Sequence, residues 1–94
     1  MTENNIGGTV YMPSYTIKAV TPKLGGTHRL AKYVGKSVHI YNLTEGENCF
    51  LMLDDDKWGN GLHLTRTEHI SGRIGDEEIQ ILTRNTMYIL KKNH

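Results

Sequence analysis

The sequence predicts a small, mostly β domain, and three observations support this prediction. Its 94 residues suffice for one domain with one modest core. Short stretches rich in β-branched and aromatic residues are separated by turn signals roughly every eight to twelve residues. Several of these stretches alternate apolar and polar residues, as strands with one buried face do. Together they favour a small barrel of about five to seven short strands over a parallel α/β fold, and barrel closure would also remove exposed edges.

The N-terminal part divides into a lead-in and the start of the domain. Residues 1–8 are polar and end in two glycines, which predicts a flexible segment. Residues 9–94 are expected to form the single barrel domain. Within it, residues 9–12 and 15–20 have strand composition, and Pro13-Ser14 between them predicts an early hairpin.

One short helix is expected over residues 28–34, where apolar residues recur at helical spacing. Thr27 is the predicted N-cap and Gly35 the predicted C-terminal stop. A helix of about two turns is marginal alone, so it must pack against the strands.

Strands account for most of the remaining chain. Residues 36–43 alternate, with Val38 and Ile40 predicted on one face. Residues 49–53 are continuously apolar, which predicts a central strand covered on both sides. Later strands are expected at residues 62–74, 78–83 and 87–90.

Composition limits the function classes. The net charge of +1 and pI near 7.9 provide no strong basic field, so any nucleic-acid contact must be local. The single cysteine, Cys49, has apolar neighbours and is expected to be buried and inert. The absence of a disulfide pair, a signal sequence and a long apolar run predicts a soluble, cytoplasmic protein without membrane contact.

Three short motifs stand out in the chain: Gly35-Lys36-x-Val38-x-Ile40, Asp56-x-Trp58-x-Asn60 and Arg84-Asn85. Together they resemble motifs of the Sm-like (LSm) family of small β barrels. The resemblance covers roughly residues 22–90 and implies an Sm-like barrel; an SH3-like barrel without this kinship is the alternative. Phe50 stands in the region where the family has a bending glycine, and Gly61 shifts the later alternation by one position unless a bulge corrects it.

The resemblance also implies a site for single-stranded RNA in a ring of identical subunits. In it Trp58 stacks on a base, Asn60 binds the edge of that base, Arg84 closes the pocket and Asp56 orients the loop. The alternative is a plain type I′ turn at Asn60-Gly61, with Trp58 folded back on the core.

The same tip also offers a contact for a protein partner. Asp54, Asp55 and Asp56 followed by Trp58 form an acidic aromatic tip. These carboxylates lack the spacing of a calcium loop, and the five histidines match no zinc spacing, so no metal and no cofactor are expected.

Two function classes follow, both non-catalytic. The first is a protein-binding or ligand-sequestering barrel of the kind that phages and mobile elements encode as inhibitors, including one that holds a small nucleotide between subunits of a homo-oligomer. The second is the Sm-like ring that binds single-stranded RNA. A small hydrolase or metal-dependent enzyme comes third, because the sequence shows no pairing of a nucleophile with a base.

Overall fold

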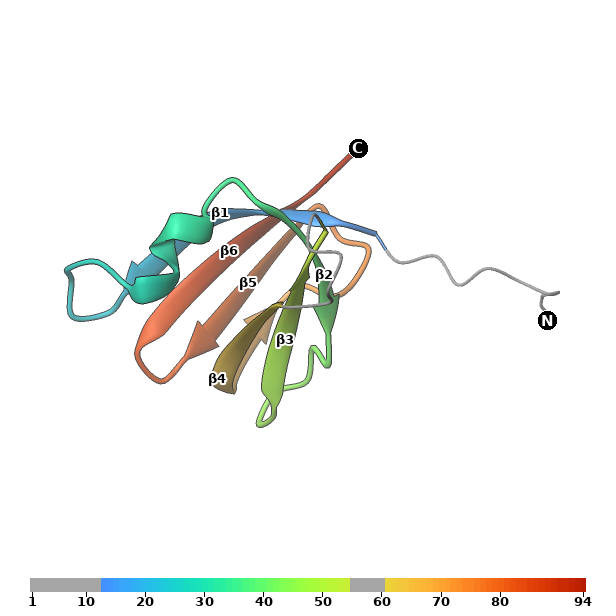
Figure 1. Cartoon of the computed structure of the whole chain (residues 1–94). Coiled ribbons are helices and arrows are strands. Elements are labelled where there is room, and N and C mark those ends of the chain that lie inside the picture. The colour runs from blue at the N-terminus through green and yellow to red at the C-terminus, as the bar shows by residue number, and fades with distance from the viewer. Residues whose placement is uncertain (1–12, 55–60) are drawn as a thin grey trace, which may run out of the picture.

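The chain folds into a closed antiparallel barrel of six strands with one short helix, and the predicted fold class is confirmed (Figure 1). The structure is a computed structural model that describes residues 13–54 and 61–94. Within that part, no helix is long and apolar enough to cross a membrane.

Each strand pairs with the next one along the chain, and the last pairs with the first. In chain order the elements are β1 (Tyr15–Pro22), η1 (Arg29–Tyr33), β2 (Ser37–Tyr41), β3 (Asn48–Leu53), β4 (Gly61–Ser71), β5 (Glu78–Thr83) and β6 (Thr86–Lys92).

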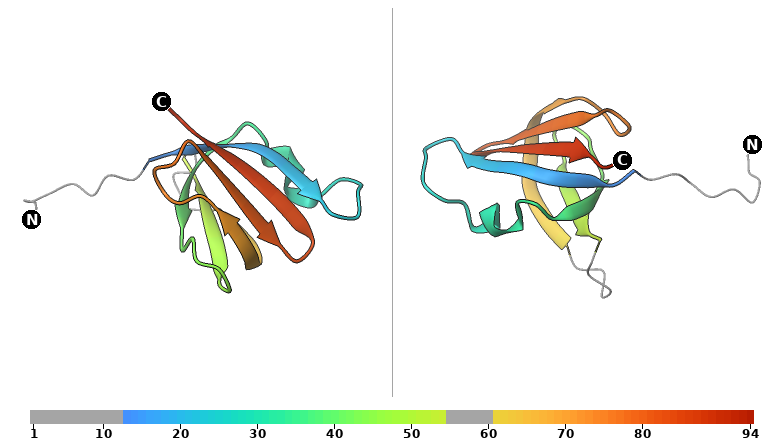
Figure 2. Two further views of the ribbon diagram at one scale, coloured as in Figure 1. Left: turned by 180° about the vertical axis from the view of Figure 1, so that it is seen from behind. Right: turned by 90° about the horizontal axis from the view of Figure 1, so that it is seen from above.

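The bend of β4 gives the barrel its shape. The first half of β4 pairs with β3, with Leu62 opposite Leu51, and the second half pairs with β5, with Ile70 opposite Ile81. The register shifts between Thr67 and His69, where the strand passes from one pairing to the other. Figure 2 shows the resulting curvature of β4 from above.

The barrel interior is apolar because alternate strand residues point inward. Val38 and Ile40 lie inside, as their alternation predicts. Leu62 and Leu64 are also buried, and Gly61 pairs directly with Met52 without a bulge at that end of β4. Leu62 and Leu64 therefore point into the barrel without any bulge next to Gly61.

The prediction that β3 is covered on both faces is wrong. Cys49 and Leu51 are buried, but Phe50 and Met52 on the outer face are only half-buried. No second layer covers this face among the described residues. The Phe50 ring instead lies against the rings of Tyr41 and His63 on the neighbouring strands.

The helix is shorter than predicted and has a different cap. It is a 3₁₀ helix of five residues, and its N-cap is His28, whose Nδ1 accepts a hydrogen bond from the Leu30 backbone N–H at 3.0 Å. Thr27 is not the cap. Leu30 is the only fully buried residue of the helix, Tyr33 is partly buried against the same core, and Val34 after the helix is exposed. Leu30 and Tyr33 therefore hold the helix on the barrel. Gly35 follows with a φ of +94°, in the left-handed region that glycine tolerates.

Strand β1 continues two residues beyond its predicted end. Its pairing with β6 extends to Pro22 opposite Thr86, and a proline is tolerated at a strand end where no further N–H is needed. Residues 9–12, the other strand of the predicted hairpin, and the lead-in 1–8 lie outside the described residues.

Candidate ligand-binding surface

Three ring side chains form a row across the outer face of β2, β3 and β4. Tyr41 lies opposite Phe50, and Phe50 lies opposite His63. The ring centroids are 6.2 Å apart for the first pair and 4.6 Å apart for the second, and both pairs are tilted. We call these three residues the aromatic row.

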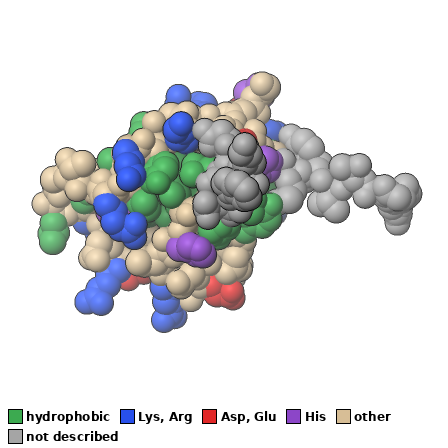
Figure 3. Space-filling view, viewed as in Figure 1, with side chains coloured by type: hydrophobic (Ala, Val, Ile, Leu, Met, Phe, Trp, Pro, Cys, Tyr) green, Lys and Arg blue, Asp and Glu red, His purple; other side chains and the backbone are tan. Residues whose placement is uncertain are grey.

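The row is accessible to solvent. Tyr41 is 38% exposed, Phe50 is half-buried and His63 is exposed. The next rung of the same face holds His39, Met52 and Gly61, so neither rung carries Asp, Glu, Lys or Arg. In the space-filling view, hydrophobic side chains gather in patches on the visible face, with Lys and Arg side chains near them (Figure 3).

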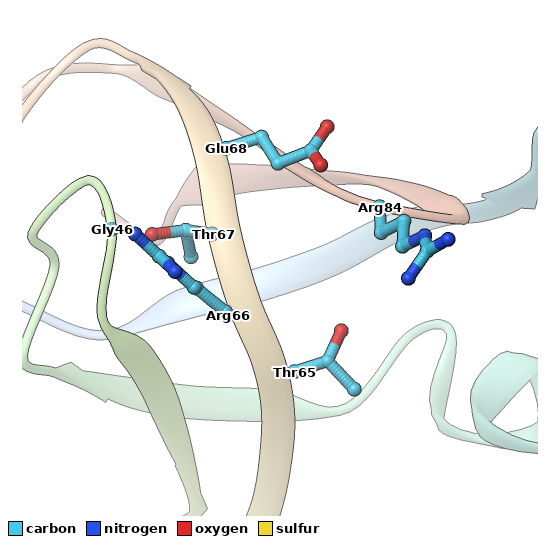
Figure 4. A pocket seen from close by; sticks show the side chains of 6 residues that line it. All are labelled: Gly46, Thr65, Arg66, Thr67, Glu68 and Arg84. Atoms are coloured by element: carbon cyan, nitrogen blue, oxygen red, sulfur yellow. The ribbon is translucent and has the colours of Figure 1, made fainter.

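A groove with a volume of about 530 Å³ lies where β4 bends. It is formed by the loop before β3, the middle of β4 and the turn between β5 and β6, and Figure 4 shows its lining. The lining residues are Gly46, Thr65, Arg66, Thr67, Glu68 and Arg84.

The buried Thr67 holds one wall of the groove in place. Its hydroxyl lies 2.8 Å from the Thr44 carbonyl oxygen and 2.9 Å from that of Glu47, in position to donate to either. The backbone N–H of Gly46 donates to the carbonyl of Thr67, and that of Thr67 donates to Glu47. The loop before β3 is therefore fixed to the bend of β4 by backbone and side-chain bonds together.

The groove has a net positive lining. The guanidinium groups of Arg66 and Arg84 form no ion pair or hydrogen bond within the part of the chain that the structure describes. The carboxylate of Glu68 lies 3.8 Å from the Lys23 ammonium, which offsets its charge. In Figure 4 the Arg66 side chain runs towards Gly46, and the Arg84 side chain projects from the β5–β6 turn on the other side. The two guanidinium groups therefore flank the groove.

Only two of the six predicted site residues lie in the described chain, and the structure does not bring them together. Arg84 lines the groove across from Gly46, which lies in the loop before β3. Asp54 follows the last residue of β3, where its carboxylate accepts a hydrogen bond from the Ser37 hydroxyl and contacts His39 Nδ1, both at 2.5 Å. They lie at opposite ends of β3. The remaining four, Asp55, Asp56, Trp58 and Asn60, fall outside the described residues.

A hydroxyl, a carboxylate and an imidazole meet at the end of β3, and the one cysteine thiol lies in the core. The Ser37 hydroxyl donates to Asp54, whose carboxylate also contacts His39 Nδ1, so Asp54 lies between the hydroxyl and the imidazole. Burial raises the pKa of the Cys49 thiol to about 11, which disfavours the thiolate. Residues 13–54 and 61–94 contain no group of three or more His, Cys, Asp or Glu that could hold a metal ion.

Sequence reasoning missed the aromatic row and Arg66. The available signal was the outward position of His63 in the alternation of β4, but the row requires the strand register as well.

No protein-family model matches this chain, and neither the curated proteins nor the solved structures include a significant match.

Proposed function

We propose that this protein is a non-catalytic module that binds single-stranded nucleic acid on the outer face of β2, β3 and β4. The observation that carries the proposal is the aromatic row of Tyr41, Phe50 and His63. Single strands are bound by stacking of bases on aromatic side chains, at about 1 to 3 kcal/mol per base. An uncharged platform beside a cationic groove has the two parts that such binding needs.

The near-neutral charge of the chain is compatible with this proposal. A net charge of +1 supports little long-range attraction of phosphates, so affinity must come from stacking and from a few local cations. Arg66 and Arg84 are cations of that kind, since their guanidinium groups are unpaired in the described chain and flank one groove.

In this proposal the single barrel is the binding unit. Strand β5 pairs with β4 on one side and with β6 on the other, so its backbone has no unpaired side for a neighbouring subunit. Because every strand of the closed barrel has two neighbours, assembly into a ring by strand pairing would have to use strand segments that are left unpaired within the barrel. The Sm-like ring therefore stays a prediction of the sequence, and the proposed site does not depend on it.

The direct test is the fluorescence anisotropy of a labelled uridine-rich RNA, and of the matching single-stranded DNA, titrated with the protein. Tyr41→Ala should weaken binding roughly 5- to 150-fold, the equivalent of one lost stacking contact. Leu24→Ala is the matched control, because Leu24 is 98% exposed and lies in the loop between β1 and η1. Failure of the wild type to bind either strand would refute the proposal.

A protein partner is the second candidate, and the composition of the same face favours it. Phe50, Met52 and Tyr41 are residue types enriched at the centres of protein interfaces, where charged residues are depleted. The chemically simplest partner is a second copy of this chain. In that case sedimentation velocity should show a dimer for the wild type and a monomer for Tyr41→Ala, without any nucleic acid.

A further inference from the structure

The groove at the bend of β4 has the charge of an anion site. Two arginines line it, and neither guanidinium has an ionic or hydrogen-bonded partner in the described chain. The groove's own carboxylate, on Glu68, is already next to Lys23. Arginine presents a planar set of donors that matches the oxygens of phosphate and carboxylate groups.

The placement of the two arginines indicates how many anionic groups the ligand carries. Arg66 extends towards Gly46 on one side, whereas Arg84 projects from the β5–β6 turn on the other (Figure 4). Thr65 lies below both arginines in this view, on β4. Two cations on opposite walls suit a ligand with two separate negative groups better than a single phosphate ion. The groove volume of about 530 Å³ is within the range of small-molecule sites.

The groove continues from the aromatic row along β4. His63 and Thr65 are successive outward positions, since Leu62 and Leu64 between and beside them are buried. Two residues of a strand span about 7 Å. A strand of nucleic acid with bases on the aromatic row can therefore place its backbone in the groove.

We infer that the groove between Arg66 and Arg84 binds two successive phosphates of a single-stranded nucleic acid whose bases stack on the aromatic row. This inference rests on the proposed function and assigns the phosphate contacts of the same surface. Arg66 then becomes a ligand-binding residue. Arg84 contacts a phosphate, whereas the Sm-like resemblance implies that it closes a pocket around a base.

The salt dependence of RNA binding tests the inference. For single strands the slope of log K against log salt changes by about 0.7 per phosphate contact, so Arg66→Gln and Arg84→Gln should each reduce it by about that amount. Each should also weaken binding roughly tenfold at low salt. Lysine at either position keeps the charge but loses the planar fork, so it should preserve the slope while lowering affinity.

Arg73→Gln is the matched control. Arg73 is an exposed arginine in the turn between β4 and β5, outside the groove lining. This substitution should leave both slope and affinity close to wild type. If Arg66→Gln and Arg84→Gln behave like Arg73→Gln while Tyr41→Ala still weakens binding, the groove inference is overturned and the proposed function stands. Circular dichroism of each variant confirms that the exposed substitutions leave the fold intact.

A second measurement separates failure of the inference from failure of the proposed function. Pyrophosphate carries two linked phosphates and no base, and its binding can be followed by amide NMR shifts. Shifts confined to Gly46, Thr65, Arg66 and Arg84 would support phosphate recognition by the groove even if RNA did not bind. An absence of shifts at these positions up to millimolar pyrophosphate would overturn it.

Discussion

Phe50 packs over Gly61 across the β3–β4 pair. A Cβ atom placed on Gly61 would lie 2.6 Å from Cζ of Phe50 and 2.5 Å from the carbonyl oxygen of Leu51. Glycine is thus required at position 61 because a side chain would collide with Phe50 and with the Leu51 carbonyl. A positive φ is not the reason, since Gly61 does not lie in the left-handed region. The glycine that appears to shift the alternation in the sequence leaves the space that the edge of the Phe50 ring occupies.

Gly61→Ala should destabilise the barrel by about 1 to 3 kcal/mol, the usual cost of forcing an extra methyl group into a packed site. Urea unfolding measures this loss. Adding Phe50→Leu should recover only part of it, because the contact with the Leu51 carbonyl is with backbone and remains. Full recovery in the double variant would show that the ring alone sets the requirement for glycine.

Asp54 joins the end of β3 to β2. Its carboxylate accepts from Ser37 and contacts His39, and its backbone N–H donates to the Ser37 carbonyl. Asp54→Ala should cost about 1 kcal/mol, since the group is partly solvated and only its side-chain contacts are lost. Asp54→Asn keeps an acceptor for Ser37 and should lose less. Thermal unfolding of the two variants checks the order, and equal losses would contradict it.

The sequence predicted those parts of the fold that depend on local periodicity. Strand β5 begins and ends where the pattern places it, and the inward positions of Val38 and Ile40 follow from a period of two. The local pattern did not reveal which outward residues meet across strands. Phe50 looked like core because its neighbours in the chain are apolar, but its contacts on the outer face come from Tyr41 and His63, nine and thirteen positions away.

The candidate site was predictable only in part for the same reason. Arg84 was selected from its turn and lies in the groove, whereas Arg66 follows the outward Thr65 directly and is exposed where the pairing of β3 with β4 shifts register. The pairing of β4 with β3 places Arg66 opposite Asn48 and so next to the loop before β3, and that register cannot be deduced from the local pattern. The helix cap was missed because His28, a less common cap than threonine, supplies the ring nitrogen that accepts from Leu30.

Thr67 should be needed for the groove as well as for stability. Its hydroxyl contacts two carbonyls of the loop before β3 and is buried. Thr67→Val keeps the shape but leaves these carbonyls without that donor, at a cost of about 1 to 3 kcal/mol. Hydrogen exchange should speed up at Gly46, whose N–H donates to Thr67.

Thr65→Val is the matched control for this prediction. Thr65 is exposed on the same strand, and a change there should alter neither stability nor exchange at Gly46 by much. Equal effects of the two substitutions would show that the hydroxyl of Thr67 does not hold the loop.

The buried thiol of Cys49 predicts a loss of stability at high pH. Burial raises its pKa from 9.0 to about 11, so between these values the unfolded chain releases a proton that the folded chain keeps. Stability is then full below about pH 9 and falls as pH rises towards 11. The expected loss is about 1.4 kcal/mol by pH 10.

Burial also raises the pKa of Tyr88, which acts in the same direction, so the comparison must remove the thiol alone. In Cys49→Ala the difference in urea stability between pH 7 and pH 10 should shrink by about that amount. An unchanged difference would mean that the thiol titrates alike in the folded and unfolded chains.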